Sequence, residues 1–464
     1  MDQGTTSTRA LVVSAEEARV VNALGHGQAF PQTGWVEQDP NELLRNVRAC
    51  LDAAGDVTAV GLANQGESCL AWDRETGRPV SPVIVWQDAR TQSLIEQLAA
   101  QGAGELTRSR AGLPLDAYFS ASKLAWILDN NADARRLHRS GRLCLGTTDA
   151  FLIHNLTGVF ATDISTAART SLMHLSGAWD TELCDLFGVP IECLPEIRPT
   201  VGDFGAVRLG ARDVPLQVAV VDQASALYGH GARRRSDAKI TFGTGAFVLS
   251  VVGPAPCDTL DTGLSLSPVW QREGAVTYGL EGGVYDASAA LNWARSLGLF
   301  SDYAEIAAFE GPMAIQRDLV FVPALSGLAA PHWDRRAGGM WLGMSLDTKP
   351  LDLARAVLEG IAFQTAEVVD AMDRINPIGP SISIDGGMSA NPAFCQMLAN
   401  VLGREIIVPD LPELTALGIA ALLGIPSTPV TTANYQPERS SGEWRHQLRR
   451  RYSEAVGRAA NWRT

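Results

Sequence analysis

Two short glycine-rich stretches share one pattern: DQGTTSTR (Asp2 to Arg9) in the first half of the chain and TFGTGAF (Thr241 to Phe247) in the second half. Each places glycines beside hydroxyl residues in a turn that adjoins a strand. Glycine lets the backbone approach an anion closely, and free amides with threonine hydroxyls donate hydrogen bonds to phosphate oxygens. One such turn alone is equally consistent with a hairpin that binds nothing. A pair, one in each half, favours two phosphate clamps that face each other across a cleft.

A third glycine cluster, IDGGMSAN (Ile384 to Asn391), ends an apolar strand and precedes a helical pattern. A strand, a tight turn and a helix N-terminus together offer free amides and the positive end of a helix dipole, which suits a nucleotide. An ordinary turn from strand to helix, with Asn391 as the helix cap, fits the same spacing equally well.

Outward from these turns, short apolar or β-branched runs alternate with longer helical patterns, which predicts an α/β fold. Apolar residues recur at three- and four-residue spacing in the expected helices, as in helices packed on a sheet. The expected strands are 10–13, 57–62, 83–86, 216–221, 240–242, 319–323 and 381–384. The expected helices are 41–54, 120–130, 351–373 and 391–402.

The chain has 464 residues, enough for two domains that each bury a full hydrophobic core. The segment GHGARRRSD (Gly229 to Asp237) interrupts the apolar pattern with glycines and three consecutive arginines. We therefore predict one domain over residues 1–230 and a second over residues 231–464.

The composition excludes several classes of protein. A net charge of -13 and a pI near 5.1 disfavour nucleic acid as a partner, because its phosphates would be repelled. Seven cysteines without a CxxC pair are typical of reduced thiols, and hence of the cytoplasm. No apolar run approaches the roughly 18 to 20 residues of a membrane span, and the start MDQGTTSTRA lacks the pattern of a secretory signal.

Taken in order, these segments resemble the FGGY carbohydrate kinases, most of all the members that phosphorylate glycerol. The resemblance spans nearly the whole chain, since further matching segments lie between the three turns and after them. These are GWVEQDP (34–40), NQGES (64–68), VWQDART (85–91), DAYFSASKLAWILDN (116–130), GTTDAFLIHNLTG (146–158), DQASALYG (222–229), FVPALSGLAAPHWD (321–334), LEGIAFQT (358–365) and ELTALGIAALLG (413–424).

The resemblance implies two actin/hexokinase-like (ribonuclease H-like) α/β domains with an active-site cleft between them. It also implies ATP-dependent phosphorylation of a small polyol, with glycerol as the leading acceptor, Asp222 as general base and Asp2 as the carboxylate that positions Mg²⁺. The residues implied to hold the acceptor are Gly66, Glu67, Trp86, Tyr118, Gln223 and Phe247, although core packing remains an alternative for Trp86 and Phe247. Those implied to hold ATP are Thr5, Thr6, Ser7, Arg9, Gly243, Thr244, Ser288, Asn292, Gly387 and Asn391.

Two departures from the family pattern keep alternatives open. Gly66 stands where the family has an arginine, which removes a charged donor and leaves space that a four-carbon polyol or a ketopentose such as xylulose could fill; a locally altered turn is a structural alternative. Family members also carry an apolar strand before the first motif, where this chain has only Met1, and we expect the reading frame to extend upstream. A catalytically silent sensor on the same fold is the third hypothesis. Homo-oligomers, dimers or tetramers, are common in the family.

Overall fold

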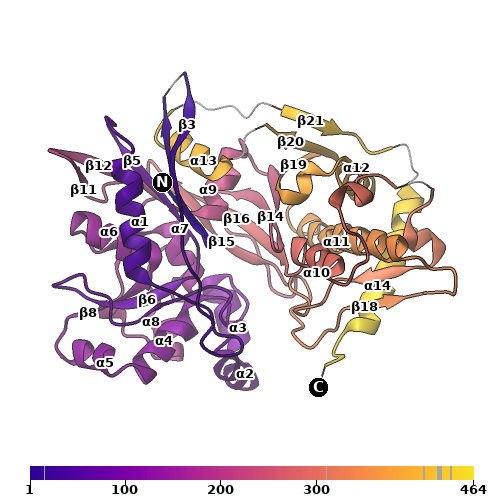
Figure 1. The fold of residues 1–464 in the computed structure, drawn as a ribbon. Helices are drawn as coiled ribbons and strands as arrows, with labels where there is room; N and C mark the ends of the chain where they lie inside the picture. The colour runs from indigo at the N-terminus through magenta and orange to yellow at the C-terminus, as the bar shows by residue number, and fades with distance from the viewer. Residues whose placement is uncertain (15, 310, 411–412, 426–430, 439–441, 464) are drawn as a thin grey trace.

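The computed structural model describes residues 1–14, 16–309, 311–410, 413–425, 431–438 and 442–463. These residues form two α/β halves, each built on one large sheet with helices packed against it (Figure 1). Every predicted strand range overlaps a strand and every predicted helix range overlaps a helix, with ends that differ by a few residues. Within the part of the chain that the structure describes, no helix is both long and apolar enough to cross a bilayer.

The sheet of the first half has six strands in the order β11-β12-β5-β1-β2-β3. Its members are β1 (Asp2–Gln3), β2 (Ser7–Val13), β3 (Ala18–Gly25), β5 (Val60–Asn64), β11 (Ala206–Leu209) and β12 (Arg212–Val221). β5 pairs in parallel with both β1 and β12, so these three strands end at the same edge of the sheet. That edge is followed by Gly4, Gln65 and Asp222, which places the first turn, the NQGES segment and the proposed base together.

β1 is internal to this sheet although it is only two residues long. The amino group of Met1 donates a hydrogen bond to the Gly61 carbonyl oxygen at 2.9 Å, and the Ala63 amide donates to the Met1 carbonyl oxygen at 2.8 Å. β1 is therefore paired on both sides, with β5 and with β2.

A second, four-stranded sheet in the first half supports the acceptor side of the site. It consists of β4 (Glu37–Gln38), β6 (Cys69–Asp73), β7 (Val83–Ile84) and β8 (Leu143–Thr147). The helices of the first half are α1 (Pro40–Asp52), α2 (Gln92–Ala100), α3 (Ala103–Ala111), α4 (Ser120–Asn130), α5 (Ala132–Arg139), α6 (Thr148–Thr157), α7 (Ile164–Ala167) and α8 (Thr181–Phe187). Strands β9 (Ala161–Asp163) and β10 (Glu196–Arg198) form a separate pair.

The sheet of the second half has seven strands in the order β15-β16-β14-β13-β19-β20-β21. They are β13 (Ala238–Phe242), β14 (Ala246–Gly253), β15 (Ser265–Arg272), β16 (Ala275–Val284), β19 (Ser381–Gly386), β20 (Glu405–Pro409) and β21 (Thr431–Tyr435). Its helices are α10 (Ser288–Ser296), α11 (Pro350–Asp373), α12 (Pro392–Leu402) and α14 (Gly442–Ala459), and β17 (Val320–Val322) pairs with β18 (Met340–Leu342). The largest core cluster joins this sheet to buried faces of α10, α11, α12 and α14.

Two helices cross where the halves meet, and glycines set their separation. α9 (Asp222–Gly229) lies against α13 (Leu414–Leu422), which comes late in the sequence but packs beside the first-half sheet (Figure 1). A Cβ at Gly418 would lie 1.9 Å from the Ser225 carbonyl oxygen, and one at Gly229 would lie 2.0 Å from the Leu414 carbonyl oxygen. Only glycine fits at both positions, so this crossing fixes α9, the helix that begins with Asp222.

Candidate active site

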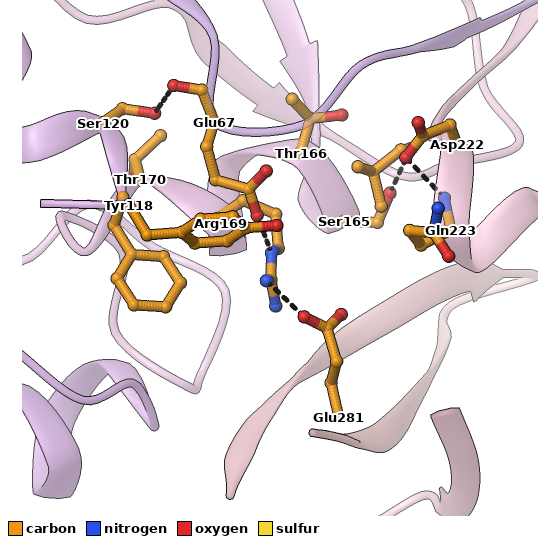
Figure 2. A network of polar contacts seen from close by, with 12 residues as sticks. Glu67, Tyr118, Ser120, Ser165, Thr166, Arg169, Thr170, Asp222, Gln223 and Glu281 are labelled. Atoms are coloured by element: carbon orange, nitrogen blue, oxygen red, sulfur yellow. Dashed lines mark hydrogen bonds and ion pairs between the residues drawn. The ribbon is translucent and has the colours of Figure 1, made fainter. Parts of the chain in front are cut away.

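The acceptor residues implied by the sequence come together around one cavity of about 110 Å³. Gly66, Glu67, Trp86, Tyr118, Asp222, Gln223 and Phe247 all line it, as does Thr5 of the first glycine turn. Its walls come from both halves of the chain, because Phe247 and Glu281 belong to the second-half sheet. Figure 2 shows several of its polar side chains, among them Glu67, Asp222 and Gln223. The structure therefore brings together residues as far apart in the sequence as Thr5 and Glu281, 276 positions, which only the fold makes neighbours.

Asp222 begins α9 directly after the buried end of β12. Its Oδ1 accepts a hydrogen bond from the Gln223 amide at 2.7 Å. The pKa of Asp222 is raised to about 7, mainly by burial and also by the negative charges of Asp2 and Glu67, which together outweigh the opposing effects of the Gln223 backbone amide and of Lys239. A carboxyl group with a pKa near neutrality is suited to accept a proton from an alcohol and to release it again.

Gln223 is held in place by a buried lysine of the second half. Lys239 on β13 has no exposed surface, and its Nζ donates to Gln223 Oε1 at 2.6 Å and to Thr241 Oγ1 at 2.7 Å. Burial lowers the pKa of Lys239, while the charges of Asp385 and Asp222 act in the opposite direction. The lysine therefore fixes the side-chain amide of Gln223 and also supplies positive charge behind Asp222.

Aromatic rings form the apolar walls of the cavity. The Trp86 ring lies edge-on to Tyr118, with centroids 5.7 Å apart, and to Phe247, with centroids 6.4 Å apart. Trp86 Nε1 donates to Thr5 Oγ1 at 3.0 Å, which links this wall to the first glycine turn. Trp86 and Phe247 are partly buried and face the cavity, which favours a role in the site over simple core packing.

Two residues of the site were missed by sequence reasoning. Arg169 (in the short segment Ala168–Thr170) pairs with Glu67, Nε to Oε1 at 2.5 Å, and with Glu281 on β16, Nη2 to Oε1 at 2.8 Å. Figure 2 shows the guanidinium between the two carboxylates. Burial alone would lower the pKa of Arg169, but the charges of Glu281 and Glu67 outweigh it and raise the pKa. The signal that could have found these residues is a lone charge inside a run of small and apolar residues: TAARTSLM for Arg169 and YGLEGGV for Glu281.

The first glycine turn joins β1 to β2, where the Gly4 amide donates to the Ser7 carbonyl oxygen at 3.0 Å. Thr5 lines the acceptor cavity, Thr6 is exposed, and Ser7 begins β2. Arg9 lies further along β2 and pairs with Glu413, Nη1 to Oε1 at 2.9 Å. Thr5 and Thr6 are thus accessible to a phosphate, whereas the Arg9 guanidinium contacts a carboxylate in this structure.

The second turn joins β13 to β14 and is tied to α10. The Ala287 amide donates to the Thr244 carbonyl oxygen at 2.9 Å, and the Ser288 amide donates to the Gly243 carbonyl oxygen at 3.2 Å. Thr244 is exposed and lines a further cavity of about 260 Å³ that shares Trp86, Tyr118, Arg169, Phe247 and Glu281 with the acceptor cavity. A phosphate held by Thr244 would therefore lie next to the acceptor.

The remaining predicted nucleotide residues line a separate pocket of about 530 Å³ in the second half. Ser288, Asn292, Gly387 and Asn391 all lie in its wall, together with apolar side chains such as Leu291. Asn391 Oδ1 accepts from the Phe394 amide at 3.1 Å, so it also caps α12, as the structural alternative held. A Cβ at Gly387 would meet no atom within 4 Å, which leaves open space where a base or ribose can lie against the backbone.

The chain matches two family models. Residues 1–229 match the N-terminal domain of the FGGY family of carbohydrate kinases, and residues 238–426 match the C-terminal domain of the same family. A glycerol kinase of Haloferax volcanii is 41% identical over 454 residues, with 92% of this chain and 88% of the relative covered. One of Thermus brockianus is 40% identical over 487 residues, with 100% and 98% covered.

Solved structures match as well. The crystal structure of Plasmodium falciparum glycerol kinase with ADP superposes with a TM-score of 0.90 at 28% identity and covers 99% of this chain and 97% of that one. The ligand-bound xylulose kinase of Lactobacillus acidophilus superposes with a TM-score of 0.88 at 21% identity, over 99% and 97% of the two chains. The second match, at this identity, speaks for the fold alone.

Proposed function

The chain belongs to the FGGY family of carbohydrate kinases, phosphotransferases with an alcohol group as acceptor and two actin/hexokinase-like domains, and on that premise we propose that it phosphorylates glycerol with ATP. The observation that carries the proposal is the position of Asp222. Its carboxyl group lies in a cavity of about 110 Å³, with hydroxyl-binding side chains around it and the first glycine turn at its wall.

The residues present fit a nucleotide. The pocket of about 530 Å³ offers an apolar wall, the side chains of Ser288, Asn292 and Asn391, and the open backbone at Gly387. When bound, ATP supplies the phosphoryl group that is transferred. Thr5 and Thr244, on turns from opposite halves of the chain, are the hydroxyl donors we assign to its phosphate oxygens.

Asp222 moves the proton in this proposal. As the acceptor oxygen forms its bond to the γ-phosphorus, its O–H bond breaks and the proton passes to the Asp222 carboxylate, while the bond from the phosphorus to the ADP oxygen breaks. Gln223, held by Lys239, and Glu67, held by Arg169, orient the hydroxyl groups. Trp86 and Phe247 pack against the carbon atoms and exclude water.

We assign Mg²⁺ to the vicinity of Asp2. The pKa of Asp2 is raised to about 6, mainly by burial. The Met1 amino group and Arg9 act to lower this pKa, whereas the negative charge of Glu413 acts to raise it. A divalent cation near this carboxylate would offset the negative charge that Asp2, Glu413 and Asp222 concentrate there. We expect Asp2→Asn to raise the Mg²⁺ concentration needed for half-maximal activity, which a metal titration of ATP hydrolysis measures.

The cavity at Gly66 supports glycerol over larger acceptors. A Cβ at Gly66 would lie 2.9 Å from Val221 Cγ2, so the space left by the missing side chain is taken up in part by this valine. A four-carbon polyol or a ketopentose is the second candidate for the acceptor, and the absence of a side chain at Gly66 is the single observation that favours this candidate.

The complete set of polar groups around Asp222 argues against a catalytically silent sensor. Cytoplasmic localisation and homo-oligomer formation remain predictions.

The experiment is a screen for ADP release with glycerol, erythritol, threitol, D-xylulose and L-ribulose, followed by identification of the phosphorylated product. We expect the highest kcat/KM for glycerol. Asp222→Asn should lower kcat by about 10²- to 10⁴-fold, the usual contribution of a general base, while the purified variant still binds ATP. Preference for erythritol or xylulose would favour the second candidate, and silence toward all five acceptors would favour the sensor.

A further inference from the structure

One nitrogen of the Arg169 side chain is buried without a partner. Nε pairs with Glu67 and Nη2 with Glu281, but Nη1 has no hydrogen-bond acceptor among the residues that the structure describes. The Arg169 side chain is only 5% exposed, so bulk water does not solvate this nitrogen freely. A buried charged donor without an acceptor costs free energy, and because Arg169 also lines the acceptor cavity, a bound ligand is a partner that would offset this cost.

Arg169 lines the acceptor cavity and also the neighbouring cavity that Thr244 lines. It lies beside Gly66, since a Cβ at that position would be 3.9 Å from Arg169 Cγ. Position 66 therefore offers no side chain to an acceptor, and the guanidinium that reaches this wall of the cavity comes from position 169. Glu67 follows Gly66 in the sequence and pairs with Arg169. Its backbone is left-handed, with a φ of 58°, a strained conformation that holds its carboxylate toward Arg169.

We propose that Arg169 is an acceptor-binding residue of this kinase, whose Nη1 donates a hydrogen bond to a hydroxyl oxygen of a neutral polyol. The proposal rests on the proposed function, because it assigns the acceptor of the same site. Two carboxylates, Glu67 and Glu281, already hold the other two nitrogens of the guanidinium, so one nitrogen, Nη1, is left for the ligand. The fixed fork of an arginine, unlike the mobile ammonium of a lysine, directs that donor to a single point.

The charges around Arg169 define the acceptor class. One guanidinium lies between two carboxylates, and Asp222 adds a third acidic group to the same cavity. Among the side chains that line the cavity the acidic groups outnumber the one guanidinium, and Lys239 behind Asp222 offsets only part of their charge, so a carboxylate or phosphate on the acceptor is less favoured than a hydroxyl, which needs only one donor. The cavity therefore selects uncharged polyols and rejects sugar acids such as gluconate.

The test compares wild type with Arg169→Ala and Arg169→Lys. We expect both variants to raise the KM for glycerol by roughly 10- to 100-fold, the effect of losing one hydrogen bond from a charged group, with a smaller change in the KM for ATP. Guanidinium chloride at millimolar concentration should partly restore the KM of Arg169→Ala, which a purely structural role would not produce. If the Arg169→Ala variant does not fold, Arg169→Lys still provides the test, because it keeps a positive charge between the two carboxylates.

Arg90→Ala is the matched control. Arg90 is equally buried, pairs with Asp88 and Glu37, and also has an Nη1 without a partner, yet it does not line the acceptor cavity. Its glycerol KM should stay within about two-fold of wild type at equal folded fraction, since no substrate hydrogen bond is removed. Unchanged glycerol KM in both Arg169 variants, or turnover of gluconate at the rate of glycerol, would overturn the proposal.

Calorimetric titration of the same polyols separates this proposal from the proposed function. If wild type turns over no acceptor, the kinase assignment fails, and polyol binding that is lost in Arg169→Lys still supports the role of Arg169. If wild type binds no polyol, the role of Arg169 fails as well.

Discussion

Lys239 Nζ lies 2.6 Å from Gln223 Oε1, and this contact joins the sheet of the second half to the helix that begins with the proposed base. The lysine has no exposed surface, so water and salt screen its charge less than they screen a charge at the surface. Among these groups is Asp222, whose pKa the lysine lowers against the larger effect of burial.

Replacement of Lys239 by methionine should move the pH profile of the enzyme. Without the positive charge the pKa of Asp222 rises above its present value of about 7. A base is active when it is deprotonated, so the acid limb of kcat/KM should shift to higher pH. The acceptor KM should also rise several-fold, because Gln223 loses its partner. A profile of kcat/KM against pH measures both.

Lys123→Met provides the control for this shift. Lys123 is also fully buried, but its Nζ donates to the carbonyl oxygens of Tyr118 and Phe119 in the first half. Its loss should leave the acid limb in place even if stability falls. Equal shifts in both variants would mean that Lys239 acts through general destabilisation.

The pKa of Asp222 also predicts how stability depends on pH. Between the ordinary value of 3.8 and about 7, the folded state keeps a proton on Asp222 that the unfolded chain has released. Stability rises with pH only where the unfolded state binds more protons, so the contribution of Asp222 falls as pH rises through this window. The Asp222→Asn variant has no titrating group at position 222. The Tm of this variant minus the Tm of wild type should therefore increase as the pH rises from 4 to 8.

Thermal unfolding of both proteins across that range measures the difference. Gly104→Val, on α3, removes no charge and should displace the Tm of wild type by the same amount at every pH. A constant difference between Asp222→Asn and wild type would contradict the raised pKa.

Gly387→Val should weaken ATP binding without harming the fold. A Cβ at Gly387 meets no atom within 4 Å, and the added side chain would enter the pocket of about 530 Å³. We expect the KM for ATP to rise by roughly 10-fold or more, consistent with an overlap that costs about 1–3 kcal/mol, and the glycerol KM to stay nearly constant. Gly104→Val, which also projects into open space but outside any nucleotide pocket, should change neither KM.

Gly418→Ala should destabilise the protein and lower kcat together. The new Cβ would lie 1.9 Å from the Ser225 carbonyl oxygen, so α13 and α9 must separate. Overpacking of this kind costs about 1–3 kcal/mol, and the displaced α9 carries Asp222. Gly457→Ala in α14 meets no atom within 4 Å and should stabilise by up to about 1 kcal/mol. Denaturant unfolding and kcat of both variants measure the contrast.

Local pattern was enough to predict much of the fold. The expected helix 120–130 coincides with α4, and the expected helix 391–402 differs from α12 by one residue, because apolar spacing and caps are properties of a continuous segment. The turns at Thr5 and Thr244 were likewise visible in the sequence, since glycine and threonine mark them directly.

The part that sequence reasoning missed depends on contacts between distant segments. Arg169 is 102 residues from Glu67 and 112 residues from Glu281. Because these separations are so long, no local sequence pattern predicts that the three charged side chains share one buried site. The contact between Val221 and Gly66 likewise could not be predicted from local sequence, because it forms where the parallel strands β5 and β12 end at the same edge of the sheet.

The crossing of α9 and α13 has a consequence for biosynthesis. Ser225 and Thr415, which meet there, are separated by 190 residues, so the helix that begins with Asp222 obtains its packing partner only after the ribosome has translated most of the second half. Contacts of such long range slow folding. The nascent first half therefore leaves one face of α9 uncovered until α13 has been made, a stage at which a chaperone has an opportunity to bind.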